Sequence, residues 1–533
     1  MAERSPAEDP VVTLPRGTVV GLKYTVEMKI GQGGHGTVYL ASDVNEGGRA
    51  VALKVLRSDR IDADRLAGFR SEYATLARLR HPHVETVFDF GKDEHGTYIA
   101  KEYLPGQDLI DATAAMTPEQ CLRMAVQLFR ALAFLHARSL IHNDVKPDNM
   151  IVVRDQAMDL GRRGVLIDFG IASVVTHQAA RSRFVAGTLG YMAPERLQGA
   201  PADARTDIYA AGILLFRLLT REYPFDTRGT PNDVMAFHLT QAPPPLRSIK
   251  KEVPGSFQPL MDRLLAKDPR ERFQTAKEVV AAIGGVLGID APIETEATQE
   301  GYIGSVGLVG RDTPLSTLTA LAERCLDGNR KSWEPAFAVI EGAPGMGKSR
   351  LLAEVMVKAR LAGGQVLTGI GRRHGGALGP LRTPLRHVMT EEESREAFRF
   401  LDESDRRGQL SRDAIITALG RLLLERGSGV VLAIDDLHRA DEMTFEALLY
   451  VARRVRAMPS VRLFCLLATR PADPERNPKH AALLQTFARE GIAPILRIDA
   501  LGPGETMQLV TQALGRMPDA AFARAPRSGR RRA

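Results

Sequence analysis

Three polar residues, Asp144, Asn149 and Asp168, combine the chemistry and the spacing that transfer of a phosphoryl group from ATP requires. Asp144 and Asn149 are five residues apart, and Asp168 follows nineteen residues later at the start of an Asp-Phe-Gly tripeptide. Such a transfer needs carboxylate and amide oxygens to hold Mg²⁺, and one carboxylate to receive a hydroxyl proton. We therefore predict that Asp144 accepts the proton and that Asn149 and Asp168 bind the metal.

A glycine-rich stretch and a lysine upstream add groups that bind phosphates. Gly31, Gly33 and Gly36 follow the pattern G-x-G-x-x-G, and Lys54 ends the segment Val51-Ala52-Leu53-Lys54 eighteen residues after Gly36. Glycine lets a backbone approach phosphates closely, and a strand lysine at this spacing is placed to hold the α- and β-phosphates. Each feature alone is also compatible with a flexible turn or a solvent-exposed strand residue, whereas together they indicate a nucleotide site.

Lys54 needs a fixed partner, and Glu72 is the candidate. In the helix that we predict over residues 62–79, Glu72 shares one face with Leu76 and Leu79. A carboxylate on that apolar face would be costly to bury without a partner. We therefore predict a salt bridge between Lys54 and Glu72, the alternative being a partly exposed helical glutamate.

The elements that must position these residues change character along the chain. Residues 24–40 and 50–56 alternate apolar and polar side chains as half-buried antiparallel strands do, and a strand pair is predicted over 84–103. After Gly106 the pattern becomes helical, and a helix over 208–219 is apolar on nearly every face, so it should be buried. A small β-rich part thus precedes a larger helical part.

Together these motifs resemble those of the eukaryotic-like serine/threonine protein kinases, over about half of the chain. The resemblance implies a two-lobed α+β kinase fold, ATP and Mg²⁺ as cofactors, and serine or threonine residues of proteins as acceptors. Lys146 matches the lysine that serine/threonine kinases place near the γ-phosphate, so the catalytic residues would be Asp144, Lys146, Lys54 and Glu72. The residues implied to bind ATP are Ile30, Gly31, Gly33, Gly36, Val38, Ala52, Lys54, Glu102, Tyr103, Asn149 and Asp168.

The same resemblance makes the residues after Asp168 an activation segment that ends at Glu195. Its predicted phosphorylation sites are Ser173, Thr176 and Ser182. Thr188 is expected to hydrogen-bond near Asp144. Glu195 is expected to pair with Arg272, and Asp207 is expected to cap backbone groups of the loop that carries Asp144. These last two roles are structural.

Two positions depart from the kinase pattern. Asn143 replaces the arginine that usually precedes the catalytic aspartate and pairs with a phosphorylated residue of the activation segment. We therefore predict that activity depends little on phosphorylation of that segment. Lys101 stands where the resemblance places the residue at the back of the adenine pocket, directly before Glu102. A lysine there could compete with Lys54 for Glu72, which leaves nucleotide affinity and inhibitor sensitivity open.

A second nucleotide site is predicted in the C-terminal half. Residues 342–349 fit the pattern G-x-x-x-x-G-K-[ST] between a predicted strand over 336–340 and a helix. Backbone N–H groups of such a loop bind phosphate, while the lysine reaches the β- and γ-phosphates and the hydroxyl binds Mg²⁺. A strand over 430–434 then ends in two carboxylates, the first to hold Mg²⁺ through water and the second to polarise the attacking water or sense the γ-phosphate. The residues of this site are Gly342, Gly345, Gly347, Lys348, Ser349, Asp435 and Asp436.

Strands that alternate with helices in this half, including one over 461–468, predict a parallel sheet and an α/β domain. With Val309-Gly310-Arg311-Asp312 upstream and Leu437-His438-Arg439-Ala440-Asp441 downstream, this half resembles the AAA-type or STAND-type regulatory ATPases, which bacterial signalling proteins sometimes carry after a kinase. Thr469-Arg470 occupies the place of a nucleotide sensor. The resemblance implies a following lid, for which the remaining chain is short, so we expect a truncated lid. Whether this site hydrolyses ATP stays open.

Composition limits the compartment. With 533 residues, 44% hydrophobic and 25% charged, the chain is typical of a globular protein with several domains. Its first fifteen residues lack the apolar core of a signal peptide, and its longest nearly apolar run, 279–289, is too short to span a bilayer. Three widely spaced cysteines fit a reducing compartment. We therefore expect a cytoplasmic protein without membrane association.

The net charge of +7 is concentrated at the C-terminus. Five arginines lie in the last ten residues, and without them the net charge is +2. A basic tail can contact the phosphates of nucleic acid, but such a tail is more often a solvated, disordered end. Because no helix-turn-helix pattern supports a transcriptional regulator, we expect no nucleic-acid partner.

These observations predict the following organisation: a flexible N-terminus over 1–20, a kinase domain over 21–287, a linker over 288–305, an AAA/STAND-like ATPase domain over 306–520, and a basic disordered tail over 521–533. The expected function is transfer of the ATP γ-phosphate to Ser or Thr of protein substrates in intracellular signalling. The second domain would be an ATP-binding regulatory module, through which the chain could self-associate. The alternative is a catalytically weak, nucleotide-dependent signalling scaffold, which the complete set of catalytic residues disfavours.

Overall fold

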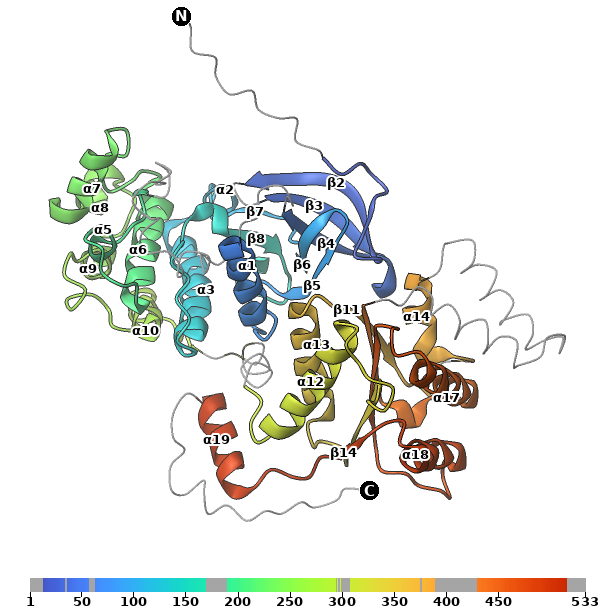
Figure 1. Cartoon of the computed structure of the whole chain (residues 1–533). Coiled ribbons are helices and arrows are strands. Elements are labelled where there is room, and N and C mark those ends of the chain that lie inside the picture. Colours follow the sequence, from blue (N-terminus) through green and yellow to red (C-terminus); the bar gives the residue numbers. More distant parts are fainter. Residues whose placement is uncertain are drawn as a thin grey trace, which may run out of the picture.

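The computed structural model describes residues 13–33, 36–56, 63–168, 189–293, 295, 298, 307–373, 376–388 and 429–514. They form a two-lobed N-terminal part and an α/β C-terminal part (Figure 1). The predicted order of a β-rich small lobe, a helical large lobe and an α/β domain is confirmed.

The small lobe is built around an antiparallel sheet with the strand order β1-β2-β3-β4-β6-β5. Every second residue of β3 is buried, as the alternation of apolar and polar side chains predicts. Helix α1 packs on this sheet, where Phe69 and Tyr73 contact the Phe90 ring with centroid distances of 6.1 and 5.1 Å. The elements of this lobe are β1 (Val19–Val20), β2 (Tyr24–Gly33), β3 (Gly36–Asp43), β4 (Arg49–Leu56), α1 (Ala63–Leu76), β5 (Val87–Asp93) and β6 (Gly96–Glu102).

The first strand lies in a segment that the sequence predicts to be flexible. Val19 and Val20 of β1 pair with β2, and the backbone N–H of Leu14 donates to the Tyr39 hydroxyl at 3.1 Å. Leu14 also packs against the small-lobe core. The prediction of a flexible end through residue 20 therefore differs from the structure, because a short apolar segment completes the edge of the sheet. Residues 1–12 lie outside the described part.

The large lobe is mostly helical, with its core around α3 and α6. The side chain of Thr117 accepts the backbone N–H of Gln120 and forms the capping box at the start of α3, as the sequence indicates. Nearly every residue of α6 is buried, which confirms the prediction from its uniformly apolar surface. The helices are α2 (Leu109–Ala112), α3 (Pro118–His136), α5 (Pro194–Leu197), α6 (Ala204–Thr220), α7 (Pro231–Thr240), α8 (Leu246–Ile249), α9 (Gln258–Leu264) and α10 (Ala276–Leu287). A small sheet contains β7 (Gln107–Asp108), β8 (Met150–Arg154) and β9 (Arg162–Leu166).

The C-terminal domain has a parallel sheet with the strand order β11-β12-β13-β10-β14. The residues of β10 and β13 are all buried, as expected for strands covered on both faces. The strands are β10 (Phe337–Glu341), β11 (Gln365–Ile370), β12 (Val430–Asp435), β13 (Leu463–Thr469) and β14 (Ile495–Arg497). The helices are α12 (Asp312–Leu326), α13 (Lys348–Leu361), α14 (Gly379–Val388), α17 (Glu442–Ala457), α18 (Pro478–Glu490) and α19 (Pro503–Leu514).

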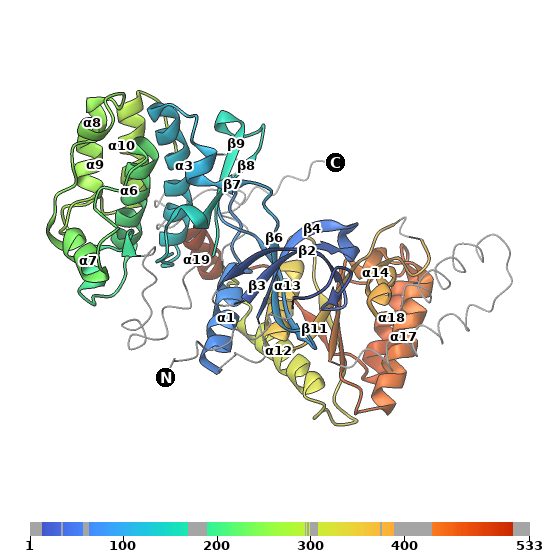
Figure 2. The same ribbon diagram turned by 90° about the horizontal axis from the view of Figure 1, so that it is seen from above.

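Helix α13 joins the two parts of the molecule. It lies beside α1 and the small-lobe sheet in both views (Figures 1 and 2). Val357 of α13 belongs to the hydrophobic cluster that contains Phe69, Tyr73 and Leu76 of α1. The small lobe and the C-terminal domain therefore share a packed apolar contact.

The beginning of the predicted linker is attached to the large lobe. Ala291 and Ile293 pack against the large-lobe core, and the Arg130 guanidinium donates to the carbonyl oxygen of Pro292 at 2.7 and 3.0 Å.

In the part of the chain that the structure describes, we find no helix that is both long and apolar enough to span a bilayer.

Candidate active site and second nucleotide site

The pairing of β8 with β9 brings Asn149 and Asp168 together. Asn149 directly precedes β8 and Asp168 comes two residues after β9, while Met150 and Leu166 are paired residues. The backbone N–H of Ile167 extends this ladder by donating to the Asn149 carbonyl at 2.8 Å. Two residues that are nineteen positions apart in the sequence therefore lie at one end of an antiparallel strand pair.

Asp144 lies within the same group of side chains. The Asn149 amide nitrogen donates to the Asp144 carbonyl oxygen and to Asp144 Oδ2, both at 2.8 Å. Lys146 Nζ also approaches Asp144 Oδ2 at 2.8 Å. The structure thus places a half-buried carboxylate between an amide and an ammonium group, with one metal-ligand candidate as its direct neighbour.

Asp207 of α6 holds the backbone of the loop that carries Asp144. Its Oδ2 accepts the N–H of His142 at 2.9 Å, and its Oδ1 accepts the N–H of Asn143 at 2.8 Å. Asn143 adopts a positive φ of 60°, a conformation that this pair of hydrogen bonds stabilises. The prediction that Asp207 caps this loop is confirmed. Burial lowers the pKa of His142, so this buried ring is neutral at pH 7.

Asp168 is surrounded by cations. Lys101 Nζ lies 2.9 Å and Lys54 Nζ 3.4 Å from Asp168 Oδ1. Glu85 completes the cluster, because its Oε1 accepts the backbone N–H of Asp168 at 2.8 Å and the Lys101 ammonium at 3.2 Å. Lys101 and then Lys54 hold the pKa of Asp168 well below its usual range, against the opposing effect of burial.

The Lys101 ammonium contacts Glu85 and Asp168. The Glu72 side chain lies outside the described residues, so the predicted Lys54–Glu72 bridge and a competition of Lys101 for Glu72 stay predictions. Sequence reasoning missed Glu85. An acidic residue within the apolar stretch Val84-Glu85-Thr86-Val87 was the signal that could have found it, because a buried carboxylate requires a cation nearby.

The predicted ATP-binding residues of the small lobe come from neighbouring strands. Val38 of β3 and Lys54 of β4 are paired residues, and Ala52 of β4 lies opposite Lys101 of β6. Ile30 and Gly31 lie on β2, next to Gly33 at its end. Gly36 is required by close packing, since a Cβ there would lie 2.5 Å from the Val55 carbonyl oxygen. These residues line the approach from β2–β4 toward Lys54.

The connection between the lobes follows β6. The Glu102 backbone N–H donates to the carbonyl oxygen of Thr86 at 2.8 Å, and the Glu102 carboxylate pairs with Arg163 at 2.6 Å. Tyr103 is half-buried in this connection. The Glu102 side chain is therefore engaged with Arg163 of β9.

The described part of the activation segment confirms one predicted contact. Arg272 is fully buried, and its NH1 and NH2 atoms each lie 2.8 Å from a carboxylate oxygen of Glu195. This paired geometry confirms the predicted Glu195–Arg272 salt bridge. The candidate phosphorylation sites and the docking threonine lie outside the described residues: Ser173, Thr176, Ser182 and Thr188.

The residues at the end of β8 and β9 fit Mg²⁺. Because Asn149 uses its amide nitrogen toward Asp144, its amide oxygen is the atom that can face a cation. The Asp168 side chain is 46% exposed, and its Oδ1 takes the contacts with the two lysines. One carboxylate and one amide oxygen, completed by nucleotide phosphates and water, are the ligands that Mg²⁺ prefers.

The predicted second site lies between β10 and α13. Gly345 and Gly347 adopt φ values of 80° and 87°, a backbone conformation that residues other than glycine rarely adopt. Lys348 Nζ donates to the Ala343 carbonyl at 2.9 Å and thus folds back over the loop. A Cβ on Gly342 would lie 2.8 Å from the Ile498 carbonyl oxygen. The loop ends at the N-terminus of the fourteen-residue helix α13, and the N-terminus of a helix favours bound anions.

Asp435 is the last residue of β12 and Asp436 follows it, with β13 between β12 and β10 in the sheet. Both carboxylates act to raise the pKa of Lys348, but burial and then the charge of Arg470 lower it overall. Lys348, Arg470 and the two aspartates therefore lie close enough to influence one another at the carboxyl ends of the strands. This is where open α/β sheets bind ligands. Ser349, in the first turn of α13, and Asp435 are the residues here that would hold Mg²⁺.

The predicted sensor pair separates into two environments. Thr469 is fully buried, and its hydroxyl lies 2.8 Å from His480 Nε2. Arg470 is half-buried, and its charge acts on Lys348. Arg470 is thus the member of the pair that faces the phosphate-binding loop, whereas Thr469 supports α18.

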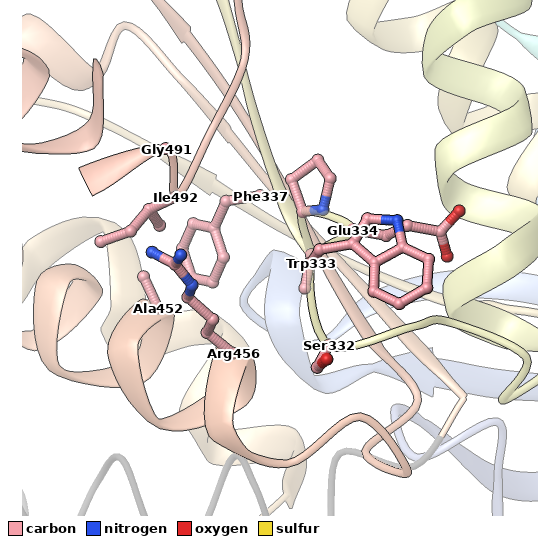
Figure 3. A pocket seen from close by; sticks show the side chains of 10 residues that line it. Ser332, Trp333, Glu334, Phe337, Ala452, Arg456, Gly491 and Ile492 are labelled. Atoms are coloured by element: carbon pink, nitrogen blue, oxygen red, sulfur yellow. The ribbon is translucent and has the colours of Figure 1, made fainter. Parts of the chain in front are cut away.

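A small pocket in the same domain lies at the opposite end of β10. Trp333, Phe337, Ala452, Arg456 and Ile492 contribute to its lining (Figure 3). Phe337 begins β10 and Gly342 follows its end, so the strand separates this pocket from the phosphate-binding loop. We assign the pocket no role in nucleotide binding.

Comparison with known proteins agrees with this division of the chain. Residues 24–282 match the protein kinase domain, and residues 307–467 match the AAA ATPase domain. The serine/threonine-protein kinase pkn3 of Myxococcus xanthus is 34% identical over 298 residues, which cover 53% of this chain and 52% of that protein. The serine/threonine-protein kinase PrkC of Bacillus subtilis is 33% identical over 279 residues, which cover 51% of this chain and 42% of that protein.

A solved structure matches a similar share of the chain. The crystal structure of the Mycobacterium tuberculosis PknI kinase domain is 28% identical, and the match covers 51% of this chain and all of that one with a TM-score of 0.40. The chain spans about half the length of the curated relatives it matches, or less.

Proposed function

Because the chain joins a protein kinase domain to an AAA ATPase domain, we propose that it transfers the ATP γ-phosphate to Ser or Thr hydroxyls of protein substrates under control of the second nucleotide site. The observation that carries this proposal is the grouping of Asp144, Lys146, Asn149 and Asp168 at the ends of β8 and β9. Serine/threonine kinases among the relatives support the class of acceptor.

The residues divide the work of the transfer. Asp144 is the group that receives the acceptor hydroxyl proton, and Lys146, 2.8 Å from it, neutralises charge that develops on the transferred group. Lys54 holds the α- and β-phosphates from the small lobe, opposite the large-lobe residues. Mg²⁺, when held by Asn149 and Asp168, would neutralise phosphate charge. Catalysis then rests on positioning and on fixed charges rather than on a covalent enzyme group.

Control by the second site has a physical route through α13. This helix begins at Lys348 in the phosphate-binding loop, and its C-terminal half packs on the small lobe. Arg360 near its end forms an ion pair with Asp89 at 2.5 Å and contacts the Tyr73 hydroxyl of α1 at 3.4 Å. Tyr73 directly follows Glu72, the predicted partner of Lys54. A displacement of α13 on nucleotide binding would therefore reach the helix that carries Glu72.

A second contact strengthens this route. Glu354, buried on α13, pairs with Arg78 beyond the end of α1 at 2.9 Å. Two ionic contacts and an apolar one thus connect α13 with the same small region of the kinase domain. A tightly packed connection transmits small shifts, because a close-packed interface rearranges between discrete states rather than deforming gradually.

The alternative function is a signalling scaffold in which the kinase part binds nucleotide but transfers little phosphate. The contact of Lys101 with Asp168 favours this alternative, since it brings a second cation to a metal ligand. The presence of Asp144, Lys146, Asn149, Asp168 and Lys54 favours the kinase, and we retain the kinase as the proposed function.

The test is transfer of labelled γ-phosphate to the protein itself and to a generic basic protein. The wild-type chain is compared with Asp144→Ala, with Lys348→Ala, and with Lys358→Ala as a control on an exposed cation of the same helix. Label that disappears with Asp144→Ala supports the kinase. A further change with Lys348→Ala, but not with Lys358→Ala, supports control by the second site. Intact ATP binding without transfer in the wild type would favour the scaffold.

A further inference from the structure

Lys101 and Glu85 form a buried ion pair behind the nucleotide site. Their exposed fractions are only 4% and 3%, and their charged atoms lie 3.2 Å apart. Two charges removed from water need close partners, because burial of an unpaired charge is strongly unfavourable. The pair is therefore a built feature of the small lobe and not a chance contact of surface side chains.

The two residues come from segments that frame the approach to Asp168. Lys101 lies on β6, opposite Ala52 of β4. Glu85 precedes β5, and its backbone N–H donates to the carbonyl oxygen of Leu166, the last residue of β9, at 3.0 Å. Asp168 follows two residues after Leu166. The ion pair thus reaches the small lobe on one side and the metal-ligand segment on the other.

The pair contacts both the backbone and the side chain of Asp168. Glu85 Oε1 accepts the Asp168 N–H at 2.8 Å, and Lys101 Nζ lies 2.9 Å from Asp168 Oδ1. Asp168 has a positive φ of 51°, a conformation that a residue with a side chain adopts only when its surroundings enforce it. The contact with Glu85 holds the Asp168 backbone in this conformation, and the contact with Lys101 holds its side chain.

Lys101 makes the shorter of the two ammonium contacts with Asp168 Oδ1, since Lys54 lies at 3.4 Å. Both lysines contact the same oxygen atom, which leaves Oδ2 as the atom for a cation in the cleft. We propose that Lys101, supported by Glu85, is a positioning residue that holds Asp168 through Oδ1 so that Oδ2 faces the nucleotide-bound metal. Its effect on turnover rests on the proposed kinase function, whereas its effect on metal binding does not.

Loss of the Lys101–Glu85 pair should change turnover and metal binding in opposite directions. Restraint of Asp168 keeps its carboxylate oriented for phosphoryl transfer, so loss of the pair should slow turnover. The Lys101 ammonium contacts the Asp168 carboxylate itself, whereas Glu85 contacts the Asp168 backbone N–H. Removal of both charges therefore removes more repulsion of a divalent cation by Lys101 than attraction by Glu85, and this gain outweighs the rotational freedom that the Asp168 side chain regains. Removal of the pair should therefore tighten metal binding while it slows transfer. A merely structural role would weaken both together.

The test uses the full chain with Lys348→Ala as the reference, so that the second site contributes little. The variant Glu85→Gln/Lys101→Met removes both charges of the pair together, so that neither is buried without the other, and its glutamine can still accept the Asp168 N–H. The matched control is Asp43→Asn/Arg49→Met, which removes another ion pair of the same sheet. Thermal unfolding of each chain verifies that it is folded.

Two measurements decide the proposal. Mn²⁺ binding to the complex with a non-hydrolysable ATP analogue is followed by electron paramagnetic resonance, and kcat and KM for ATP are measured with a generic basic protein. We expect the Glu85→Gln/Lys101→Met chain to bind Mn²⁺ about tenfold more tightly and to have a kcat about tenfold lower, with the control unchanged.

Unchanged or weaker Mn²⁺ binding in the Glu85→Gln/Lys101→Met chain would overturn the proposal, and so would tighter Mn²⁺ binding with an unchanged kcat. If neither the wild-type chain nor the reference chain transfers phosphate, the proposed kinase function fails. The Mn²⁺ titration then still decides by itself whether Lys101 acts on the metal ligand.

Discussion

Arg360 of the C-terminal domain and Asp89 of the small lobe form a buried ion pair, with 2.5 Å between Nε and Oδ1. Asp89 also contacts Lys23 at 2.7 Å and the Tyr24 hydroxyl at 3.2 Å, so the guanidinium enters an existing network of the small-lobe core. The network holds Asp89 ionised, since the charges of Lys23 and Arg360 lower its pKa against the effect of burial. Arg360, near the C-terminal end of α13, is thus part of the small-lobe core.

Substitution of Arg360 should weaken the coupling between the second nucleotide site and phosphoryl transfer. In the wild-type background we expect Lys348→Ala to change the transfer rate, and in an Arg360→Ala background we expect a smaller change, because the contacts with Tyr73 and Asp89 are lost while the Glu354–Arg78 pair remains. Lys358→Ala is the control background. Rates of labelled phosphate transfer for the four combinations give the coupling. An effect of Lys348→Ala that is equal in both backgrounds would falsify the α13 route.

Arg272 should be far more important for stability than its neighbour Arg270. Arg272 is fully buried and paired with Glu195, so Arg272→Ala leaves a largely buried carboxylate without its partner and should lower the free energy of unfolding by about 3–5 kcal/mol. Arg270 is 84% exposed in its pair with Asp268, and Arg270→Ala should change stability far less, because a solvated ion pair contributes little. Urea unfolding of the two variants measures the difference, and equal losses would contradict the assignment.

Stability should fall in mild acid because of buried histidines. Burial lowers the pKa of His83 to about 4, whereas an unfolded chain protonates histidine near pH 6.5. The unfolded state therefore binds more protons between these values, so the contribution of His83 is fully present above pH 6.5 and is lost as the pH falls to 4. At pH 5 the expected loss is about 2 kcal/mol.

The variant His83→Asn isolates this effect, because its amide can still donate to the Gly164 carbonyl, which lies 3.0 Å from His83 Nδ1. Urea unfolding at pH 7 and pH 5 should show a smaller difference for this variant than for the wild type. The partly exposed His95 supplies the control, His95→Asn. A pH dependence that is the same in the wild type and in His83→Asn would rule out this role of His83.

Activity should depend little on phosphorylation of the activation segment. Asn143 stands where an arginine would bind a phosphorylated residue, and its backbone N–H is already held by Asp207. Treatment with a phosphatase, followed by assay of transfer to an added substrate, should change the rate by no more than about threefold, since the neutral Asn143 side chain cannot form the bidentate ion pair of an arginine with a phosphate. Complete loss of transfer would show that another cation replaces the missing arginine.

Local patterns predicted much of this molecule. The alternation in β3, the apolar faces of α6 and the capping box before α3 are properties of neighbouring residues, and the structure reproduces each of them. The Glu195–Arg272 bridge and the cap formed by Asp207 were also predicted, although from the resemblance and not from local pattern. The flexible end through residue 20 was the clearest difference, because β1 is a two-residue strand that pairs across a tight turn with β2, too short to show an alternating pattern.

The order of the two domains and the prediction of two phosphate-binding loops follow from residue types at short, regular spacings. The contacts of Lys101 with Glu85 and Asp168, and of Arg360 with the small-lobe core, became visible only in the folded chain. Both results join residues distant in the sequence, and their partners are chosen by strand register and helix packing. A charged residue in an apolar segment indicates that a partner of opposite charge is needed, but only the folded chain determines which partner lies within reach.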